Sequence, residues 1–248
     1  MNANANIGKE VSIGPYSVVE NDVTIGDRTM IGNNVTISSN TKIGEDCQIF
    51  HSASIGEIPK DLKYNNEDTV VLIGDRSIIR EFVTINKGTN ASGKTVVGSD
   101  CLLMASTHIA HDCVLGNDIV LTNQAALAGS VYVGDGAILG GYAIVHQFCS
   151  IGSYSFCAMG SAVNKDIPAY VKVRGNPAKP FGVNVTGIKR IGYSKETIEA
   201  LRSAYRSIYR KKLTVDEAVK DLDSLRKDFE EVDIFLSSIE GSKRGISR

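Results

Sequence analysis

Residues 97–163 read VGSDCLLMASTHIAHDCVLGNDIVLTNQAALAGSVYVGDGAILGGYAIVHQFCSIGSYSFCAMGSAV. In this stretch an apolar residue returns at every sixth position for twelve repeats. The same six-residue phase holds nine times over residues 7–55 and three times over residues 73–85. Nine, three and twelve hexads total 24, and a fixed period sustained for this long indicates a solenoid.

Each hexad predicts one short strand followed by one corner. Three hexads of six residues close a coil of 18, so 24 hexads make eight coils whose strands stack about 4.8 Å apart. Glycine often follows the apolar residue, and we interpret it as the residue that permits the corner's backbone angles. Four of the five cysteines stand at the fifth hexad position and Cys157 at the first, so we interpret all five as small core residues.

The phase breaks twice and then ends, which predicts the organisation of the chain. We expect a parallel β-helix over residues 1–170, with loops leaving it near 57–72 and 86–96. Long excursions from a regular scaffold often carry function, although a tolerated surface insertion is the alternative for both loops. Residues 171–193 are expected to form a linker, and 194–248 a small helical domain. The signals for that domain are an N-cap at Ser194 and a capping box from Thr214 to Glu217.

Composition narrows the class of protein. The formal net charge is −1, so nucleic acid is not an expected partner. The N-terminal residues lack a basic and an apolar signal region, and no apolar run approaches the ~20 residues that span a bilayer. We therefore expect a cytoplasmic protein. The sequence has no CxxC pair, so neither a zinc knuckle nor a disulfide framework is indicated.

Histidine is scarce, and three of the four histidines gather on one region of the predicted coil. Residues 18 apart stack in adjacent coils, so His111, Gly129 and Gln147 form one column. His108 precedes the corner before His111, and His146 lies next to Gln147. The three histidines are expected to span about 10 Å along the coil axis at the strand spacing.

The column has the elements of a general base with an oxyanion donor beside it. Asp112 follows His111 directly, and a neighbouring carboxylate can fix the tautomer of a histidine that acts as general base. The backbone N–H of Gly129 lies one coil away, where it could meet a developing oxyanion. A surface histidine on a solenoid is more often inert, so position alone leaves this role open.

Several motifs resemble one known family. They are SIGEIPKDLKY at 54–64, HIAHDC at 108–113, VHQFC at 145–149, GNPAKPFGVN at 175–184 and GIKR at 187–190. Together and in this order they are similar to the bacterial acyl-carrier-protein:UDP-N-acetylglucosamine O-acyltransferases. The resemblance runs from the first coils through the helical tail. Hexads alone would be shared by many acyltransferases.

The resemblance implies a left-handed coil and a homotrimer with active sites between subunits. It also implies an activity, the transfer of a 3-hydroxyacyl group from acyl carrier protein to the glucosamine 3-position of UDP-N-acetylglucosamine. That reaction is the first step of lipid A biosynthesis. The sugar hydroxyl attacks the thioester directly, so the resemblance implies no cofactor, no metal and no covalent intermediate.

The resemblance also implies roles for individual residues. His111 matches the general base, Asp112 its orienting partner and Gly129 the oxyanion donor. Residues that match substrate contacts are the loop residues Asp61 and Lys63, the lining residues His108, His146 and Gln147, and the nucleotide-region residues Asn184 and Arg190.

Met159 matches the position that limits acyl-chain length in the family. It ends a column made of Ala105, Asn123 and Gly141. Where glycine stands at this position, longer chains fit, and each CH₂ that cannot be buried forfeits about 0.8 kcal/mol. We therefore expect a preference for a chain of about ten carbons over fourteen. Nearby Phe156 is an alternative end of the groove.

Four positions depart from the family pattern. Ser130 replaces a histidine beside the oxyanion glycine, Pro177 replaces another histidine, and Thr186 and Ile191 replace an acidic and a basic residue. The base is kept, so activity is expected. These departures leave open the nucleotide affinity and the choice between a 3-hydroxyl and a 3-amino acceptor.

Three alternatives remain at this point. One is another acyltransferase of the same fold, either the N-acyltransferase of the pathway or an acetyl-CoA enzyme. The second is a γ-type carbonic anhydrase, which would hold zinc with three histidines across subunits. The third is a non-enzymatic scaffold. Eight basic and two acidic residues between Lys189 and Lys212 further predict a docking surface for the acidic carrier protein.

Overall fold

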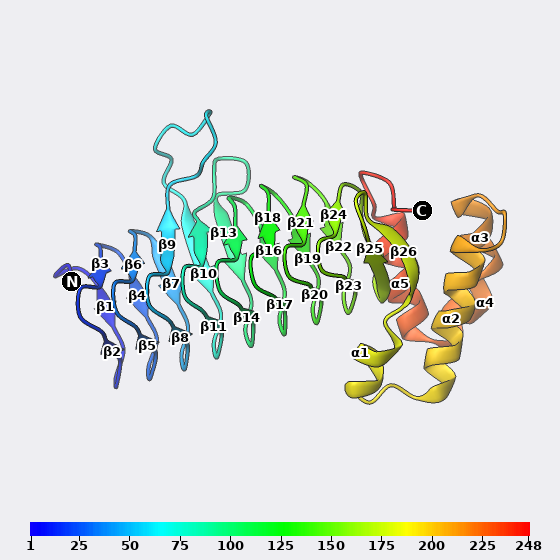
Figure 1. The fold of residues 1–248 in the computed structure, drawn as a ribbon, viewed down its shortest axis with the longest axis horizontal. Coiled ribbons are helices and arrows are strands. Elements are labelled where there is room, and N and C mark those ends of the chain that lie inside the picture. The colour runs from blue at the N-terminus through cyan, green and yellow to red at the C-terminus, as the bar shows by residue number, and fades with distance from the viewer.

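The computed structural model describes all residues from 1 to 248, and its main body is the predicted left-handed parallel β-helix. The 24 strands from β1 to β24 divide over three parallel sheets, which gives eight coils (Figure 1). The first sheet contains β1 (Asn6–Ile7), β4 (Thr24–Ile25), β7 (Thr41–Ile43), β10 (Val70–Ile73), β13 (Lys94–Val97), β16 (Val114–Leu115), β19 (Tyr132–Val133) and β22 (Ser150–Ile151).

The two other sheets repeat this pattern. The second sheet begins with β2 (Ser12–Ile13), β5 (Met30–Ile31), β8 (Gln48–Ile49), β11 (Ile78–Ile79), β14 (Leu102–Leu103), β17 (Val120–Leu121), β20 (Ile138–Leu139) and β23 (Phe156–Cys157). The third contains β3 (Val18–Val19), β6 (Thr36–Ile37), β9 (Ser54–Glu57), β12 (Thr84–Asn86), β15 (His108–Ile109), β18 (Ala126–Leu127), β21 (Ile144–Val145) and β24 (Ala162–Val163).

The core follows the hexad. The first and fifth positions point inward, so Ile109, Cys113 and Leu115 are buried in succession. All five cysteines are buried, as predicted. Burial, together with the negative charge of the neighbouring Asp112, raises the pKa of the Cys113 thiol to about 12, so this thiol stays protonated.

The corners are made differently from the sequence prediction. The left-handed backbone angle falls on the fourth hexad position, which is rarely glycine: Arg28, Arg76 and Tyr142 have φ of 58°, 55° and 58°. The glycines at the second position serve close approach between coils instead. A Cβ on Gly116 would lie 2.1 Å from the Asp135 carboxylate of the next coil.

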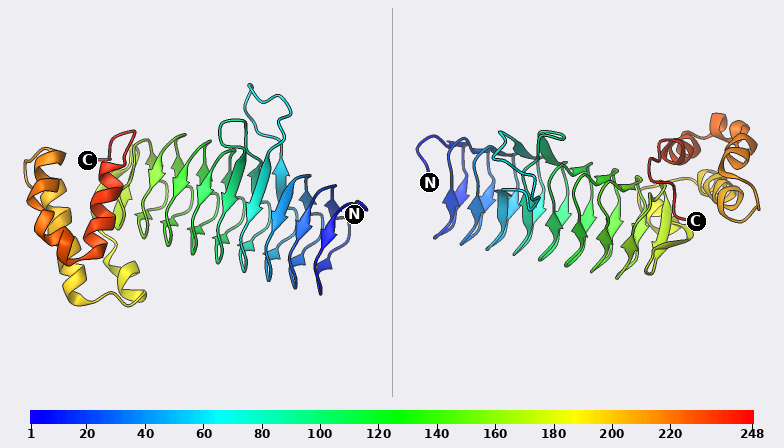
Figure 2. Two further views of the ribbon diagram at one scale, coloured as in Figure 1. Left: turned by 180° about the vertical axis from the view of Figure 1, so that it is seen from behind. Right: turned by 90° about the horizontal axis from the view of Figure 1, so that it is seen from above.

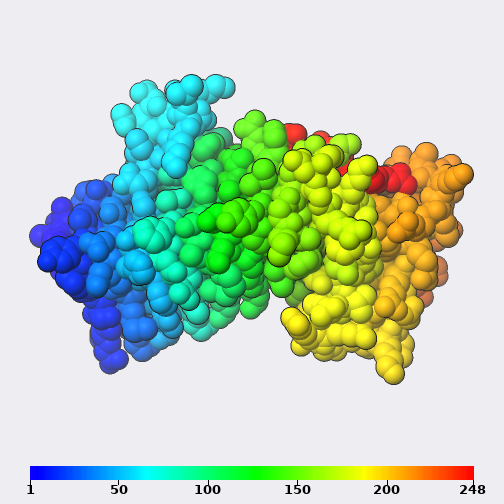
Figure 3. All heavy atoms as spheres, viewed as in Figure 1, coloured from blue at the N-terminus to red at the C-terminus, as the bar shows by residue number.

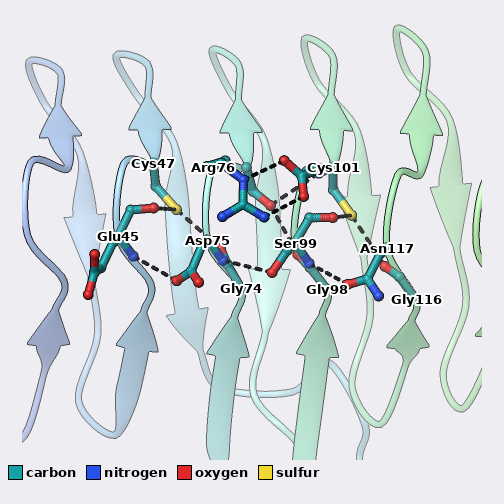
Figure 4. A network of polar contacts seen from close by, with 12 residues as sticks. Glu45, Cys47, Gly74, Asp75, Arg76, Gly98, Ser99, Cys101, Gly116 and Asn117 are labelled. Carbon is teal, nitrogen blue, oxygen red and sulfur yellow. Dashed lines mark hydrogen bonds and ion pairs between the residues drawn. The ribbon is translucent and has the colours of Figure 1, made fainter.

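Polar side chains join the coils along the corner between the first and second sheets. The backbone N–H of one third-position residue donates to the third-position side chain of the next coil (Figure 4). The distances are 2.9 Å from Glu45 to Asp75, 3.0 Å from Asp75 to Ser99 and 2.8 Å from Ser99 to Asn117. This ladder satisfies N–H groups that the short strands leave free.

Both loops leave the coil at one corner, where the chain passes from the third sheet to the first. We call this row of turns the loop corner; it includes residues 110–113, 128–131 and 146–149. The first loop covers residues 58–69 between β9 and β10, and the second covers 87–93 between β12 and β13. They stand side by side on one edge (Figures 1 and 2), and the first forms a knob on the surface (Figure 3).

The segment expected to be a linker is structured, which corrects that prediction. β25 (Val171–Arg174) pairs in parallel with β23, and β26 (Lys179–Val183) returns antiparallel to it. The hairpin therefore extends the second sheet to ten strands. The sequence of this hairpin does not show the six-residue period, because an antiparallel turn interrupts the phase.

The helices lie at the C-terminal end of the coil (Figure 2). They are α1 (Val185–Arg190), α2 (Lys195–Tyr209), α3 (Val215–Asp221), α4 (Asp223–Asp228) and α5 (Glu230–Glu240). The predicted caps are confirmed: Ser194 Oγ accepts from the Thr197 N–H at 3.1 Å, and Thr214 and Glu217 form the capping box. None of these helices has the length and apolarity needed to cross a membrane.

Candidate active site

The predicted column of His111, Gly129 and Gln147 runs along the loop corner. The His111 carbonyl accepts a hydrogen bond from the Ser130 N–H at 2.9 Å, and the Gly129 carbonyl accepts one from the Phe148 N–H at 3.1 Å. These bonds tie three successive turns together. His111 therefore sits on a rigid coil edge rather than on a mobile loop.

His111 and Asp112 form a hydrogen-bonded pair. His111 Nδ1 lies 2.8 Å from Asp112 Oδ2, and the His111 side chain is 20% exposed. Burial opposes ionisation of Asp112, but hydrogen bonds from Ser92, Thr89 and His111 outweigh it and lower the pKa of this carboxyl. An ionised carboxylate only accepts, so Nδ1 carries the proton and Nε2 presents its lone pair.

The second loop supplies the other partners of Asp112. The Thr89 N–H donates to Oδ1 at 2.9 Å and the Thr89 hydroxyl donates to Oδ2 at 2.6 Å. The Ser92 hydroxyl reaches Oδ1 at 2.5 Å. Sequence reasoning missed Thr89 and Ser92, because nothing in their spacing links them to a residue 20 or more positions away.

Gly129 packs against the imidazole of His111. A Cβ at this position would lie 2.5 Å from Cε1 and 2.7 Å from Nε2 of His111, which is too close for any side chain. The Gly129 N–H has no acceptor within the chain. By contrast, Asn117 also stands at the third hexad position, and its N–H donates to the Asp135 carboxylate at 2.7 Å. A free donor therefore stands next to the imidazole ring.

His108 lies on β15, beside the turn that holds His111. Burial, together with the charges of Lys60 and His111, lowers the pKa of His108 and favours its neutral form. Its Nδ1 lies 2.7 Å from the Thr84 hydroxyl. Lys60 belongs to the first loop, so this loop reaches the histidines as well.

An apolar groove of about 520 Å³ runs from His108 along the third sheet. Its floor follows the strand register from His108 through Ala126 and Ile144 to Ala162. The predicted lining residue His146 borders this groove. Its neighbour Gln147 is exposed on the loop corner and does not line it.

Asp61 and Lys63 lie on the first loop. Asp61 Oδ1 accepts from the Lys63 N–H at 3.0 Å, which makes a local turn and leaves the Lys63 side chain exposed. The base of the loop is held by Asn86, whose amide donates to the Ile58 carbonyl at 3.0 Å. The loop thus brings Lys60, Asp61 and Lys63 to the edge where His111 lies.

Asn184 and Arg190 lie on a different face of the molecule. They border a cavity of about 260 Å³ between the second sheet and α1, together with Lys172 and Phe181. Asn184 is only 6% exposed and caps α1, accepting from the Gly187 N–H at 3.2 Å. The single chain does not bring these two residues to the loop corner.

Met159 and three of the four departures from the family pattern also lie away from the loop corner. Met159 is 81% exposed on the corner after β23 and does not line the apolar groove. Among the departures, Thr186 borders the cavity of Arg190, and Ile191 follows α1 and is exposed. Pro177 borders a basic hollow formed by Arg174, Lys179 and Arg210.

Ser130, the fourth departure from the family pattern, lies on the loop corner itself. It has the left-handed backbone angle, with φ of 58°, and its N–H donates to the His111 carbonyl. No three side chains of His, Cys, Asp or Glu in the chain gather closely enough to hold a metal ion.

The hexapeptide coil, with a His–Asp pair beside a free backbone donor, indicates the class of hexapeptide-repeat transferases. Residues 4–39 accordingly match the family described as bacterial transferase hexapeptide (six repeats). Residues 166–247 match the second domain of UDP N-acetylglucosamine O-acyltransferase.

Full-length relatives name the family. An acyl-[acyl-carrier-protein]–UDP-N-acetylglucosamine O-acyltransferase from Pseudomonas entomophila is 47% identical over 98% of this chain and 95% of its own length. The solved acyltransferase of Acinetobacter baumannii has a TM-score of 0.97 at 41% identity, covering 100% of this chain and 97% of that one. The solved UDP-N-acetylglucosamine acyltransferase of Bacteroides fragilis has a TM-score of 0.98 at 38% identity, covering 100% of this chain and 97% of that one.

The chain belongs to the acyl-[acyl-carrier-protein]–UDP-N-acetylglucosamine O-acyltransferase family. The resemblance inferred from the sequence motifs is thereby confirmed, and the protein is an acyltransferase. The scaffold and carbonic anhydrase alternatives are set aside on this ground.

Proposed function

We propose that the protein transfers a 3-hydroxyacyl chain from acyl carrier protein to the 3-hydroxyl of the glucosamine unit of UDP-N-acetylglucosamine, the first step of lipid A biosynthesis. His111 is the general base. The observation that carries this assignment is the imidazole whose Nδ1 is bound to Asp112 and whose Nε2 is free beside the Gly129 N–H.

The proposed reaction uses that geometry. Nε2 of His111 removes the proton of the sugar hydroxyl as its oxygen attacks the thioester carbonyl. The Gly129 N–H donates to the oxyanion of the tetrahedral intermediate. The intermediate expels the carrier's thiolate, which takes the proton back from the imidazolium. Asp112 remains ionised throughout and stabilises the imidazolium.

The apolar groove beside His108 suits the nonpolar part of the acyl donor. Its floor of alanine and isoleucine side chains offers burial for methylene groups, each worth about 0.8 kcal/mol. His108 and His146 border the groove at its polar edge, where the pantetheine amide groups would pass. Gln147 stands exposed on the loop corner, where it would contact the pantetheine arm of the carrier.

A homotrimer would complete the site. Asp61, Lys63 and His111 share the loop corner, whereas Asn184 and Arg190 border a cavity on the second-sheet face. One nucleotide sugar can meet both groups only if a second subunit brings its second-sheet face to the loop corner. In that arrangement Arg190 and Lys172 stabilise the diphosphate, and the site lies between subunits.

A product assay with His111→Asn tests the general base. General base catalysis is typically worth about 10²–10⁴-fold, so this variant should lose nearly all transfer while the coil stays folded. A variant that keeps more than half of the activity would contradict the assignment. The assay should use hydroxyacyl carrier protein and acetyl-CoA as donors, and 3-hydroxyl and 3-amino sugar nucleotides as acceptors. Preference for acetyl-CoA or for the amino sugar would favour the alternative acyltransferases.

A further inference from the structure

The second loop makes a set of contacts that the reaction described above does not use. Three of its donors converge on the Asp112 carboxylate: the Thr89 N–H, the Thr89 hydroxyl and the Ser92 hydroxyl, at 2.9, 2.6 and 2.5 Å. Asp112 is 6% exposed, so these bonds lie away from bulk water. Each carboxylate oxygen has two donors once His111 is included.

The protons of the two hydroxyls can be assigned from their other partners. Thr89 Oγ1 accepts from the Ala91 N–H at 3.2 Å, which leaves its own proton for Asp112 Oδ2. Ser92 Oγ lies 2.9 Å from the Lys94 carbonyl and 2.5 Å from Asp112 Oδ1. The charged acceptor at the shorter distance takes the proton.

We propose that Thr89 and Ser92 are positioning residues for acyl transfer, whose hydroxyls hold the Asp112 carboxylate in place and share its negative charge. The inference rests on the proposed function, in which His111 is the base. The two hydroxyls do not touch His111. They act on it through Asp112, which fixes the ring orientation and its tautomer.

This arrangement sets how strongly Asp112 favours the imidazolium. When a donor is removed, more negative charge stays on the carboxylate, and protonated His111 becomes more favourable. The unprotonated ring is the base, so activity should then begin at higher pH. His108 on β15 also interacts with His111, and Lys60 of the first loop acts on His108; neither residue changes in the variants below.

The first test is kinetic and uses Thr89→Val, which keeps the side-chain shape, and Ser92→Ala. Each should lower kcat about tenfold, the order expected for one hydrogen bond to a charged group. KM for the sugar nucleotide should stay the same, and the acidic limb of the kcat profile should move to higher pH. Thr89→Ser should restore the wild-type profile. Asn90→Ala is the matched control, because Asn90 reaches Glu67 and not Asp112.

The second test does not depend on activity. The His111 ring signal, assigned by its loss in His111→Asn, should titrate at higher pH in Thr89→Val than in wild type. An unchanged titration and pH profile would overturn the inference, and so would a Thr89→Ser variant as slow as Thr89→Val. If His111→Asn stays active while the titration still moves, the base assignment fails and the role of the two hydroxyls on Asp112 stands.

Discussion

At the scale of single residues, the third hexad position decides what each corner does. Between the first and second sheets it carries Asp, Ser and Asn side chains that accept N–H groups of the preceding coil. At the loop corner it carries His111 and Gly129, and the Gly129 N–H stays free. The same backbone geometry thus yields a structural ladder at one corner and a candidate oxyanion donor at another.

Gly129→Ala should therefore disable the enzyme without unfolding it. The added Cβ would meet the imidazole of His111 at 2.5 Å, so the ring must leave its position. A displacement of about 1 Å can cost about 10²-fold in rate, and we expect a loss of at least that order in kcat. Gly129 has no left-handed backbone angle, so the coil itself tolerates alanine.

The control for that experiment is Gly141→Ala, at the third hexad position of the corner between the second and third sheets. There a Cβ meets nothing nearer than the Asn123 carbonyl at 3.4 Å. Thermal unfolding should give nearly the same Tm for both variants and for wild type. A Gly129→Ala variant with normal kcat would contradict the packing of His111 against this glycine.

At the scale of elements, the two loops contribute different groups to the edge of the coil where His111 lies. The first loop brings Lys60, Asp61 and Lys63 to the edge where the second loop holds Asp112. The sequence identified both loops as interruptions and left a function open for both, but it singled out no residue of the second, since none of them belongs to a family motif. The second loop binds Asp112, which lies one full coil further along the chain.

Met159→Gly tests the length of the acyl chain. Met159 projects from the corner after β23 and is 81% exposed. In the proposed trimer, we expect the acyl chain to end against it. If its thioether shortens the slot, wild type should prefer a hydroxyacyl chain of about ten carbons, since each unburied CH₂ forfeits about 0.8 kcal/mol. The variant should gain on the fourteen-carbon donor. The measurement is the ratio of rates on the two donors; an unchanged ratio would point to Phe156 as the end of the groove.

At the scale of the whole molecule, the functional groups lie on separate faces of a rigid coil. His111 and the loops occupy one corner, and the cavity of Asn184 and Arg190 occupies the second-sheet face near the helices. The C-terminal tail is fastened to the last coil by Asp166, whose carboxylate accepts from the Ser150 N–H at 2.8 Å and the Ser242 hydroxyl at 2.7 Å. Coil and tail are thus held together.

Mixed trimers test whether the site is shared between subunits. His111→Asn and Arg190→Ala subunits should each be nearly inactive as homotrimers. Because a shared site takes His111 from one subunit and Arg190 from another, co-expression of the two variants should create some intact sites and recover activity. The readout is transfer by purified mixed trimers. If activity stays at the level of the two parents, both residues act within one chain and the intersubunit site is wrong.

Docking of the carrier protein is expected at the basic surface of α2. Lys211 is already paired with Asp221 at 2.7 Å, and Arg202 lies by Glu199 at 2.5 Å, so Arg206 and Arg210 are the better probes. Arg206→Glu and added salt should both raise KM for the acidic carrier.

The control for docking is Lys9→Glu, which makes the same change of charge at the opposite end of the coil. It should leave KM for the carrier unaltered. Steady-state kinetics at two salt concentrations decide the matter. Equal effects of the two reversals would mean that overall charge, and not docking on α2, governs the association.

The sequence by itself determined the coil, because each of the 24 hexads places an apolar residue at the same position and so predicts the same strand and corner. It also determined the adjacency of His111 and Gly129, since residues 18 apart must stack. The tertiary structure alone decided the contacts of Thr89 and Ser92 with Asp112, and the separation of Arg190 from His111. Those depend on the paths of a loop and a hairpin outside the repeat, where no period relates sequence distance to distance in space.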